Sequence, residues 1–463
     1  MSRWILAGAF SLALAFTGYA AQETEWSPPP YKQLRYDEDY TYLQDPSRRV
    51  DFFDPIKFVP LGTVEGRYLS VGGEVRPFFE FFRNEEWGSI PGDNGYVLQR
   101  YMLHVDVHWN RRARVFGQLK SGIETGRRGG PRPVDEDKLD VHQAFLDITL
   151  GSSPARSLTF RVGRQEMSFG HQRLVNYREG PNLRRSFDGL RSTFRAEAWT
   201  LDAFATKPVR NEPGFFDDSP DPERNFWGVY ATRPMGKPLS VDVYYLGLTD
   251  EDARYDQGAR RETRHTNGAR LWGASGSWDY DLELIYQWGS FGEGNVRAWA
   301  VAPVFGYTFR GLRATPRLAL SLDVHSGDRD PNDADLETYH PLYPKGAYYG
   351  LGPPFGPSNH WEIHPILELQ LARRVWARAD WLFYWRLSHR DGVYDLVGNL
   401  LRTGQLSDAT FVGHAPAIES IFSIDRHWDM TTQFSRFFVG RFLRETPPGQ
   451  DMTYFALWLT LKF

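Results

Sequence analysis

The sequence predicts an all-β fold, a transmembrane antiparallel β-barrel of about 16–18 strands with long extracellular loops. Three observations predict it. Hydrophobic and polar residues alternate at every second position in segment after segment, which is the period of a β-strand. Short links between these segments alternate with long polar ones. The last segment, 452–463, is amphipathic and ends on the aromatic Phe463.

Composition excludes several other classes of protein. The 463 residues include 71 aromatic residues but no cysteine, so disulfide scaffolds, thiol catalysis and thiolate metal sites are excluded. No apolar run reaches the roughly 18 residues of a membrane-spanning helix. The net charge of −4 gives no general reason to bind nucleic acid. The basic residues are unusual, because 46 are arginine and only 8 are lysine.

The beginning of the chain predicts export from the cytoplasm. Residues 1–20 resemble a secretory signal peptide, with Arg3 followed by an apolar run from Trp4 to Phe16 and small residues at Gly18 and Ala20. Cleavage after Ala20 would leave 443 residues. A retained N-terminal anchor is the alternative.

The remaining chain reads as one unit behind a short N-terminal segment. Residues 21–60 are rich in proline and charge, and we expect a periplasmic, plug-like segment that leads into the first strand. Residues 61–463 form the expected barrel. At about 24 residues for each strand and its share of loop, 16–18 strands fit, and bacterial barrels favour even numbers.

The strand segments share a pattern of faces. In 69–82, Leu69, Val71 and Phe79 fall on one face, while Glu74 and Arg76 fall on the other. The same pattern recurs in Arg100–Trp109, Arg317–His325, His360–Leu371 and Val375–Arg386. A soluble β-sandwich or propeller also alternates, but its apolar face needs a second sheet. A membrane barrel turns that face to lipid and the charged face to its lumen.

Alternation directs many arginines to the expected lumen. They are Arg76, Arg100, Arg114, Arg161, Arg191, Arg195, Arg317, Arg378 and Arg386. A guanidinium group is permanently charged and has several hydrogen-bond donors, so a row of arginines can bind a carboxylate at one site after another. The acids on the same faces would keep any one site from binding too tightly; they are Glu74, Glu80, Asp106, Asp147, Asp323 and Asp380. The alternative is that these arginines and acids only form ion pairs with one another, and that the high arginine content reflects genome composition.

Other clusters carry no specific chemistry. His104, Asp106 and His108 have a spacing that suits metal ligands, but polar lumen residues explain them equally well. An aspartate-rich stretch, 328–335, could bind calcium or form a solvated loop. Serines near His389 and His427 give no hydrolase pattern. We therefore expect no enzyme activity, no catalytic residue, no metal site and no cofactor.

Several longer strings occur in a fixed order along the chain. They are RYDEDY at 35–40, DPIKFVPL at 54–61, YLSVGGEVR at 68–76, QAFLD at 143–147, VGRQE at 162–166, PNLR at 181–184, FDGLR at 187–191, FWGVY at 226–230, SGDRD at 326–330, DGVY at 391–394 and RFFVGRFL at 436–443. Taken together, the chain from about residue 31 to 463 resembles the alginate export family of outer-membrane porins.

The resemblance implies an eighteen-stranded monomeric barrel with an electropositive constriction, through which an acidic polysaccharide leaves the periplasm. Matching strings place the family's pore-lining residues at Glu74, Arg76, Arg161 or Arg164, Arg191 and Arg378. Strand parity turns Arg161 inward and Arg164 outward unless a bulge intervenes. Family members also occur outside alginate producers, so the resemblance does not identify the polymer.

We therefore expect passive export of an anionic, alginate-like polysaccharide through the bacterial outer membrane. The expected channel residues are Glu74, Arg76, Arg100, Arg161, Arg164, Arg191, Arg378, Asp380 and Arg386. Expected partners are outer-membrane lipid and lipopolysaccharide, the barrel-assembly machinery and a periplasmic export partner. The long tract 326–357 is the expected gate. An uptake porin for small anions or sugars, and a non-conducting structural or adhesive barrel, are the alternatives.

Overall fold

The computed structural model describes residues 26–463 except 65, 154, 237 and 353–354. The expected signal peptide, 1–20, lies outside the described residues. Within them, no helix is long and apolar enough to cross a membrane.

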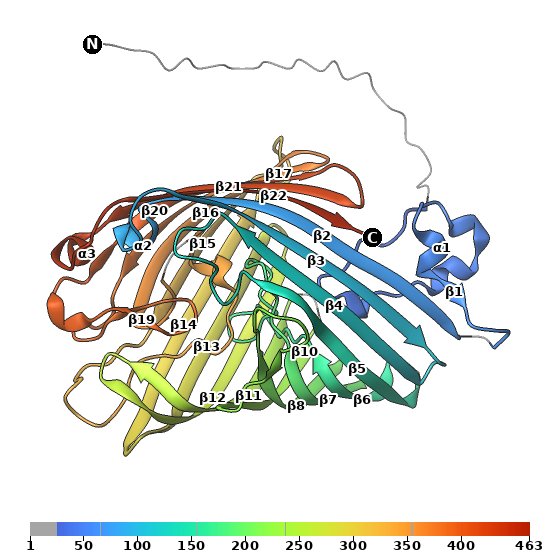
Figure 1. Cartoon of the computed structure of the whole chain (residues 1–463), viewed down its shortest axis with the longest axis horizontal. Helices are drawn as coiled ribbons and strands as arrows, with labels where there is room; N and C mark the ends of the chain where they lie inside the picture. The colour runs from blue at the N-terminus through green and yellow to red at the C-terminus, as the bar shows by residue number, and fades with distance from the viewer. Residues whose placement is uncertain (1–25, 65, 154, 237, 353–354) are drawn as a thin grey trace, which may run out of the picture.

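The described residues form a closed antiparallel barrel of eighteen long strands (Figure 1). Each strand pairs with its neighbour along the chain, and the barrel closes where β2 pairs with β22. The strands are β2 (Tyr68–Arg83), β3 (Asn94–His108), β4 (Ala113–Thr125), β5 (Asp137–Ser153), β6 (Arg156–Gln165), β7 (Phe187–Ala196), β8 (Trp199–Arg210), β10 (Arg224–Pro234), β11 (Ser240–Tyr255), β12 (Gly258–Ser275), β13 (Trp278–Phe291), β14 (Gly294–Thr308), β15 (Arg317–His325), β16 (His360–Ala372), β17 (Val375–Trp385), β20 (Phe411–Ser423), β21 (Trp428–Val439) and β22 (Met452–Lys462). The predicted fold class is confirmed.

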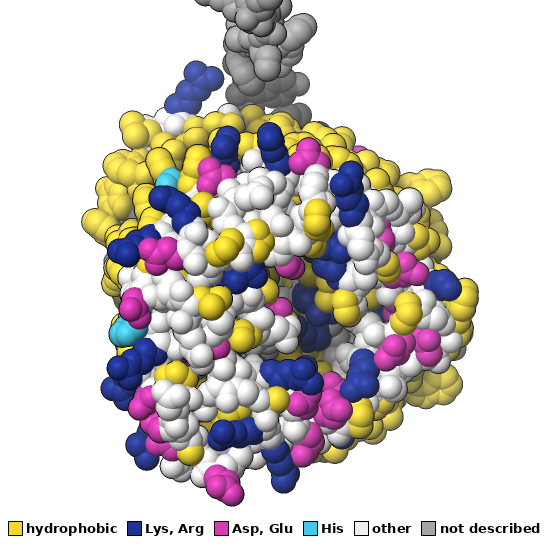
Figure 2. All heavy atoms as spheres, turned by 60° about the vertical axis from the view of Figure 1, so that its left-hand side comes forward, with side chains coloured by type: hydrophobic (Ala, Val, Ile, Leu, Met, Phe, Trp, Pro, Cys, Tyr) yellow, Lys and Arg dark blue, Asp and Glu magenta, His cyan; other side chains and the backbone are white. Residues whose placement is uncertain are grey.

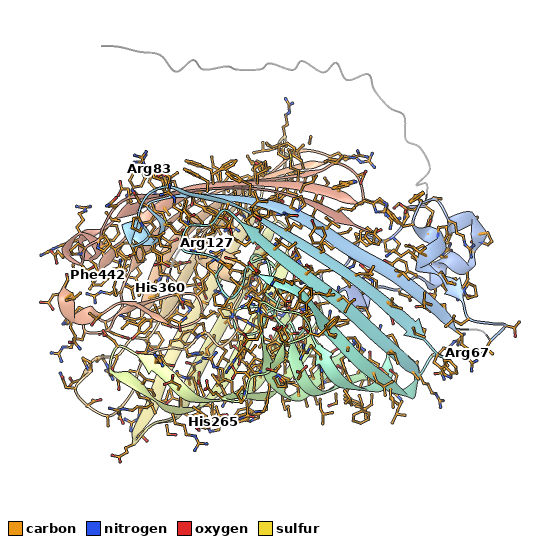
Figure 3. All side chains as sticks on the ribbon, in the orientation of Figure 1. Arg67, Arg83, Arg127, His265, His360 and Phe442 are labelled. Carbon is orange, nitrogen blue, oxygen red and sulfur yellow. The ribbon has the colours of Figure 1, made fainter. Side chains whose placement is uncertain are left out.

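The two ends of the barrel differ in their links. At the end where β2 begins, the links between strands hold two to eight residues. At the other end the longest links span 166–186, 326–359 and 386–410. Short turns face the periplasm in barrels of this kind, so the ends are named periplasmic and extracellular accordingly. Figure 3 labels Arg67 at the periplasmic end, and Arg83 and Arg127 at the extracellular end.

The barrel wall has an apolar outside and a polar inside. On β3, Tyr101, Leu103 and Val105 are 36–47% exposed, whereas Arg100 and Asp106, which flank this run at positions of the opposite parity, are at most 5% exposed. Because successive side chains of a strand point to opposite faces, one face meets lipid and the other meets the lumen. The alternation predicted from the sequence is confirmed on this strand.

The remaining elements are short. They are η1 (Arg35–Asp37), η2 (Thr41–Gln44), η3 (Pro46–Arg48), α1 (Asp54–Lys57), β1 (Val59–Pro60), α2 (Glu85–Gly88), β9 (Ser219–Pro220), η4 (Gly346–Tyr349), β18 (Val393–Tyr394), β19 (Leu400–Arg402), η5 (Gly404–Leu406) and α3 (Arg441–Glu445). Residues 26–58, here called the N-terminal segment, lie at the periplasmic end beside β2 (Figure 1). Its small apolar core of Tyr40, Leu43 and Phe58 packs on Tyr68 of β2.

Candidate channel constriction

Two extracellular links fold back into the barrel. They are residues 166–186, the first inner loop, and residues 326–352 with 355–359, the second inner loop. Backbone bonds join them: Tyr343 N donates to Leu174 O at 2.9 Å, and Asn176 N donates to Tyr343 O at 2.9 Å. Their apolar side chains pack on the inner wall of β7, β8, β10, β11, β13 and β14. The joined loops therefore narrow the lumen, and the tract predicted as a gate is one of the two.

The first inner loop is held to the wall by an ion-pair cluster. Arg76 Nη1 of β2 donates to the backbone carbonyl of Glu179 at 2.8 Å. Arg100 of β3 donates through Nε to Glu74 Oε1 at 2.8 Å, and its guanidinium also pairs with the Glu179 carboxylate. Arg184 Nε lies 3.4 Å from Glu179 Oε2. The Glu179 side chain is still 44% exposed, so this paired carboxylate remains open to the lumen.

A second cluster contacts the N-terminal segment. Arg161 Nε and Nη2 donate to the two carboxylate oxygens of Asp147 at 2.8 and 2.9 Å. The guanidinium carbon of Arg161 lies 4.0 Å from the ring centroid of Tyr36 and 3.8 Å from that of Phe145. The Tyr36 hydroxyl donates to the carbonyl of Glu166 at 3.0 Å. Tyr36 is thus a buried aromatic residue that reaches from the N-terminal segment into the barrel.

The N-terminal segment around Tyr36 also binds basic side chains of the wall and of the first inner loop. Arg114 Nη1 donates to the Tyr36 carbonyl at 2.7 Å, and Arg184 Nη2 donates to the Gln33 carbonyl at 2.8 Å. Arg191 Nε donates to Asp202 Oδ1 at 2.9 Å, and its Nη1 lies 3.5 Å from the Tyr36 hydroxyl. The segment therefore uses donors that would otherwise face the lumen.

A third group lies on β15–β17. Arg378 Nε is 2.7 Å from Asp380 Oδ2, and Arg378 Nη2 donates to His364 Nε2 at 3.3 Å. Arg173 of the first inner loop crosses to this side and pairs with Asp323 of β15. Alternating cations and carboxylates therefore surround the joined loops from both sides.

Two arginines of the first inner loop differ from the rest. Among the described residues, no carboxylate lies within ion-pair distance of Arg178 or Arg185. Arg178 Nε donates to the carbonyl of Leu183 at 3.2 Å. The Arg185 guanidinium lies 4.9 Å from the Tyr343 ring, and its buried Nη1 has no hydrogen-bond partner in the part of the chain described. Figure 2 shows the extracellular end hollowed among the loops, with basic side chains in the depth of the hollow.

Seven of the nine expected channel residues lie on inward-facing positions of their strands. They are Glu74, Arg76, Arg100, Arg161, Arg191, Arg378 and Asp380. The expectation is wrong for the other two. Arg164 shares the outward side of β6 with the exposed Val162 and donates to both Asp188 oxygens at 2.8 and 2.9 Å. No register shift interrupts the pairing of β6 with β7, so nothing turns Arg164 inward.

Arg386 lies one residue beyond the end of β17, and it anchors the link 386–410. Its Nη1 donates to the Asp391 carbonyl at 2.8 Å, and its Nη2 donates to the carbonyls of Ser407 and Ala409, both at 2.6 Å. Its guanidinium carbon lies 3.9 Å from the Phe442 ring. With its donors committed to backbone carbonyls, Arg386 is a loop anchor rather than a lumen residue.

Sequence reasoning missed the loop residues of the constriction, chiefly Arg173, Arg178, Glu179 and Arg185. Strand parity says nothing about residues outside strands. The available signal was composition, because four arginines fall within the 21 residues of the first inner loop.

One group of possible metal ligands occurs among the described residues. Asp140, Asp217 and Asp218 place carboxylate oxygens within 4.8 Å of one another. Lys120 Nζ already lies 2.7 Å from Asp218 Oδ2, which supplies a positive charge to this group. Neither the His104–His108 pattern nor the aspartates of 328–335 gather into such a group in the described part of the chain.

The comparisons with known proteins agree on the architecture. The chain matches the alginate export family over residues 67–456. No curated protein matches it. It is similar to crystal structures of OccK8 (OprE) from Pseudomonas aeruginosa (TM-score 0.58, 13% identity, 85% of this chain and 98% of that one) and OccAB1 from Acinetobacter baumannii (0.59, 11%, 88% and 99%). A BenF-like porin from Pseudomonas fluorescens Pf-5 is also similar (0.60, 10%, 85% and 98%).

At these identities the solved structures establish the fold, an outer-membrane porin barrel, whereas the family match covers most of the chain. Together they place the protein in the bacterial outer membrane as a channel. The chain belongs to the alginate export family.

Proposed function

We propose that the protein is a passive channel whose basic constriction conducts an anionic, alginate-like polysaccharide from the periplasm to the outside. The observation that carries this proposal is the pair Arg178 and Arg185, which have no carboxylate partner on the loop that crosses the lumen. Unpaired guanidinium groups attract a carboxylate-bearing polymer and raise its local concentration. The net negative charge of the chain is no objection, because the local field selects the ion.

The paired arginines around this site suit transit rather than tight binding. Arg76, Arg100 and Arg184 share Glu179, and Arg378 shares Asp380. A sugar carboxylate can replace one partner at a time while the arginine keeps another. Conduction requires sites that bind well enough to admit the polymer but weakly enough to release it. Transit of the polymer requires no catalytic step by the chain.

The N-terminal segment is proposed as a periplasmic plug. Its carbonyls at Gln33 and Tyr36 accept hydrogen bonds from Arg184 and Arg114. The same guanidinium groups would bind the carboxylates of an entering polymer. The polymer, or a periplasmic export partner that delivers it, would displace the segment. We also propose that the barrel is monomeric, that it contacts lipopolysaccharide and that the barrel-assembly machinery inserts it.

Ion selectivity in planar bilayers tests the proposal. The reversal potential in a potassium chloride gradient should show anion preference, and the double variant Arg178→Ala/Arg185→Ala should lower the anion-to-cation permeability ratio by roughly threefold or more. Arg164→Ala is the matched control, because it removes an arginine that faces outward. A cation-selective wild type, or equal loss in the control, would contradict a basic constriction.

Addition of alginate oligosaccharides separates the alternatives. An exporter should be blocked by oligomers added on the periplasmic side more strongly than by neutral ones of equal length. Block by small neutral sugars alone would favour an uptake porin. No current, even after deletion of 26–58, would favour a structural or adhesive barrel.

A further inference from the structure

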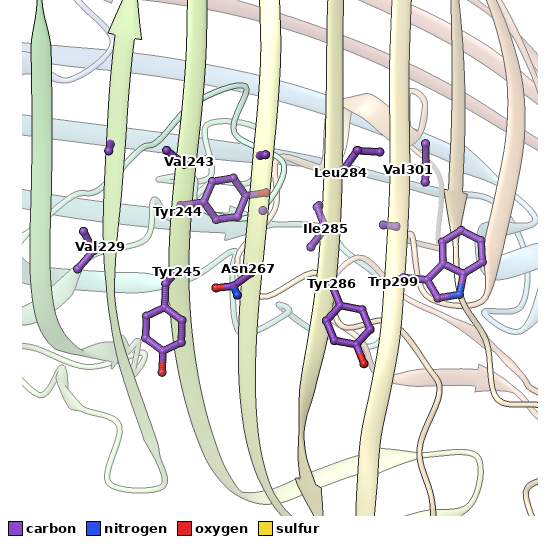
Figure 4. A pocket seen from close by; sticks show the side chains of 14 residues that line it. Val229, Val243, Tyr244, Tyr245, Asn267, Leu284, Ile285, Tyr286, Trp299 and Val301 are labelled. Atoms are coloured by element: carbon purple, nitrogen blue, oxygen red, sulfur yellow. The ribbon is translucent and has the colours of Figure 1, made fainter.

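The outer wall of the barrel is hollowed at β10–β14. A trough of about 800 Å³ lies there, and most of the residues that line it are at outward-facing positions (Figure 4). Small residues leave the space, since Ala231 and Ala269 point outward where neighbouring positions carry Val243, Leu284 and Tyr286. The trough is mostly apolar, with Asn267 as a polar lining residue, and such a surface suits contact with acyl chains.

A second hollow of about 670 Å³ lies beyond the trough, toward the extracellular end. Its charged and titratable lining consists of Arg297, Arg329, His389 and Arg390 with one acid, Glu337. Tyr286 and Trp299 line both hollows, so the two join into one surface. An apolar trough therefore leads into a basic pocket.

Strand β14 shows the order of these features along the membrane normal. Its outward positions run from the extracellular end through Arg297, which is 62% exposed, and Trp299, which is 41% exposed, to the apolar Val301. At about 3.3 Å per residue, Arg297 and Val301 are about 13 Å apart along the strand. Cation, interfacial aromatic and apolar residue thus follow one another as the headgroup, interface and chain of a lipid do.

The arginines of the basic pocket are available to a ligand. Arg297 makes only a loose ion pair with Asp335, at 3.8 Å, and Arg390 makes one with Asp330, at 4.0 Å. Arg329 is more firmly paired, with Glu337, but is largely exposed. Exposed pairs of this kind contribute little, so a phosphate can replace the carboxylate partner.

We propose that this surface is a binding site for the lipid A part of lipopolysaccharide, with an acyl chain in the trough and phosphate on the arginines. Three guanidinium groups around one pocket suit a disaccharide with two phosphates better than a single phosphodiester. Because Arg329 belongs to the second inner loop, a bound lipid would also hold the outer part of that loop against the wall. The site is independent of the cargo of the channel.

Native mass spectrometry of the delipidated full-length protein tests the site with three probes: Kdo2-lipid A, phosphatidylglycerol and the deacylated phosphorylated disaccharide. We expect Kdo2-lipid A to bind the wild type at least about tenfold more tightly than either other probe. Arg297→Ala/Arg390→Ala should weaken that binding by about tenfold. Arg254→Ala/Arg261→Ala, which removes two exposed, ion-paired arginines outside both hollows, should leave it unchanged.

A second variant tests the trough alone. Ala269→Trp fills the space from the lipid side and should weaken Kdo2-lipid A without changing the binding of the deacylated disaccharide. Heat-modifiable migration on gels verifies that each variant is folded. Equal weakening in the Arg254/Arg261 control, or phosphatidylglycerol binding as tight as lipid A, would overturn the proposal.

Discussion

Replacement of Tyr36 by alanine tests how the N-terminal segment is held in the barrel. The ring is buried between Phe116 and Phe145 and lies against Arg161, while its hydroxyl bonds to a carbonyl of the first inner loop. Burial of the ring contributes about 2 kcal/mol, its contact with the guanidinium about 1 kcal/mol and its hydrogen bond about 1 kcal/mol. Water refills the lumen, so we add nothing for an empty cavity.

The expected loss of about 4 kcal/mol corresponds to a several-hundredfold larger undocked population. Amide hydrogen exchange measures it, because we expect the bonded amides in 35–49 to exchange mainly from the undocked segment. These amides should exchange several hundredfold faster in Tyr36→Ala, up to the limit of a free segment. Tyr36→Phe, which loses only the hydroxyl, should give about a two- to tenfold change.

Phe52→Ala is the matched control, because this aromatic residue of the same segment is 88% exposed. It should leave exchange unchanged, and amides of β22 should not respond to any of the three variants. If Tyr36→Ala accelerated exchange by less than about threefold, the ring would not be what holds the segment, and the energies assigned to its contacts would be wrong.

Three further outcomes are expected. Burial, and then the neighbouring Arg35, lower the pKa of Lys57 from 10.5 to about 7. Docking of the N-terminal segment should therefore strengthen as the pH rises from 7 to 10.5 and stay constant below 7. Hydrogen exchange across this range should show the slope, and Lys57→Met should abolish it. Arg386→Ala should lose charged hydrogen bonds worth about 3–5 kcal/mol in sum and expose 386–410 to limited proteolysis, with the barrel core intact. Arg164→Gln should lower thermal stability without changing ion selectivity, whereas Arg191→Gln should reduce anion preference in planar bilayers.

Each of the three has a contradicting result. A flat pH profile in the wild type would mean that Lys57 is neutralised by a partner rather than by burial. Unchanged proteolysis of 386–410 would mean that the hydrophobic contacts of this link suffice without Arg386. A change of selectivity in Arg164→Gln would place that residue in the conduction path after all.

The wall of the barrel could be predicted from the sequence because a strand has a fixed period. In 69–82 parity alone places Glu74 and Arg76 inward, and the observed β2 extends this segment by one residue at each end. The same rule fails where the strand stops. The alternation of Val375–Arg386 predicts that Arg386 faces the lumen, but β17 ends at Trp385 and the next residue follows loop geometry.

The constriction itself could not be predicted in this way. Glu179 and Arg185 lie in a link without regular structure, and their positions depend on contacts with β2, β3 and the second inner loop, which are distant in the sequence. Tyr36 likewise depends on a pocket formed by β4, β5 and β6. Such contacts become visible only when the barrel has closed and brought these strands around the loops.

The docking of Arg35 adds a consequence for biogenesis. Its Nη1 donates to the Gly73 carbonyl at 3.0 Å, and its Nη2 donates to the Phe463 carbonyl at 2.8 Å. Gly73 of β2 and Phe463, which follows β22, also form backbone hydrogen bonds with each other. The acceptor pair exists only once the first and last strands have met. A half-built barrel therefore lacks this pair of acceptors, so the N-terminal segment can dock completely only after the first and last strands have paired. Because the Arg35 guanidinium group needs acceptors from both sides of the β2–β22 pairing, closure of the barrel comes before complete docking of the segment.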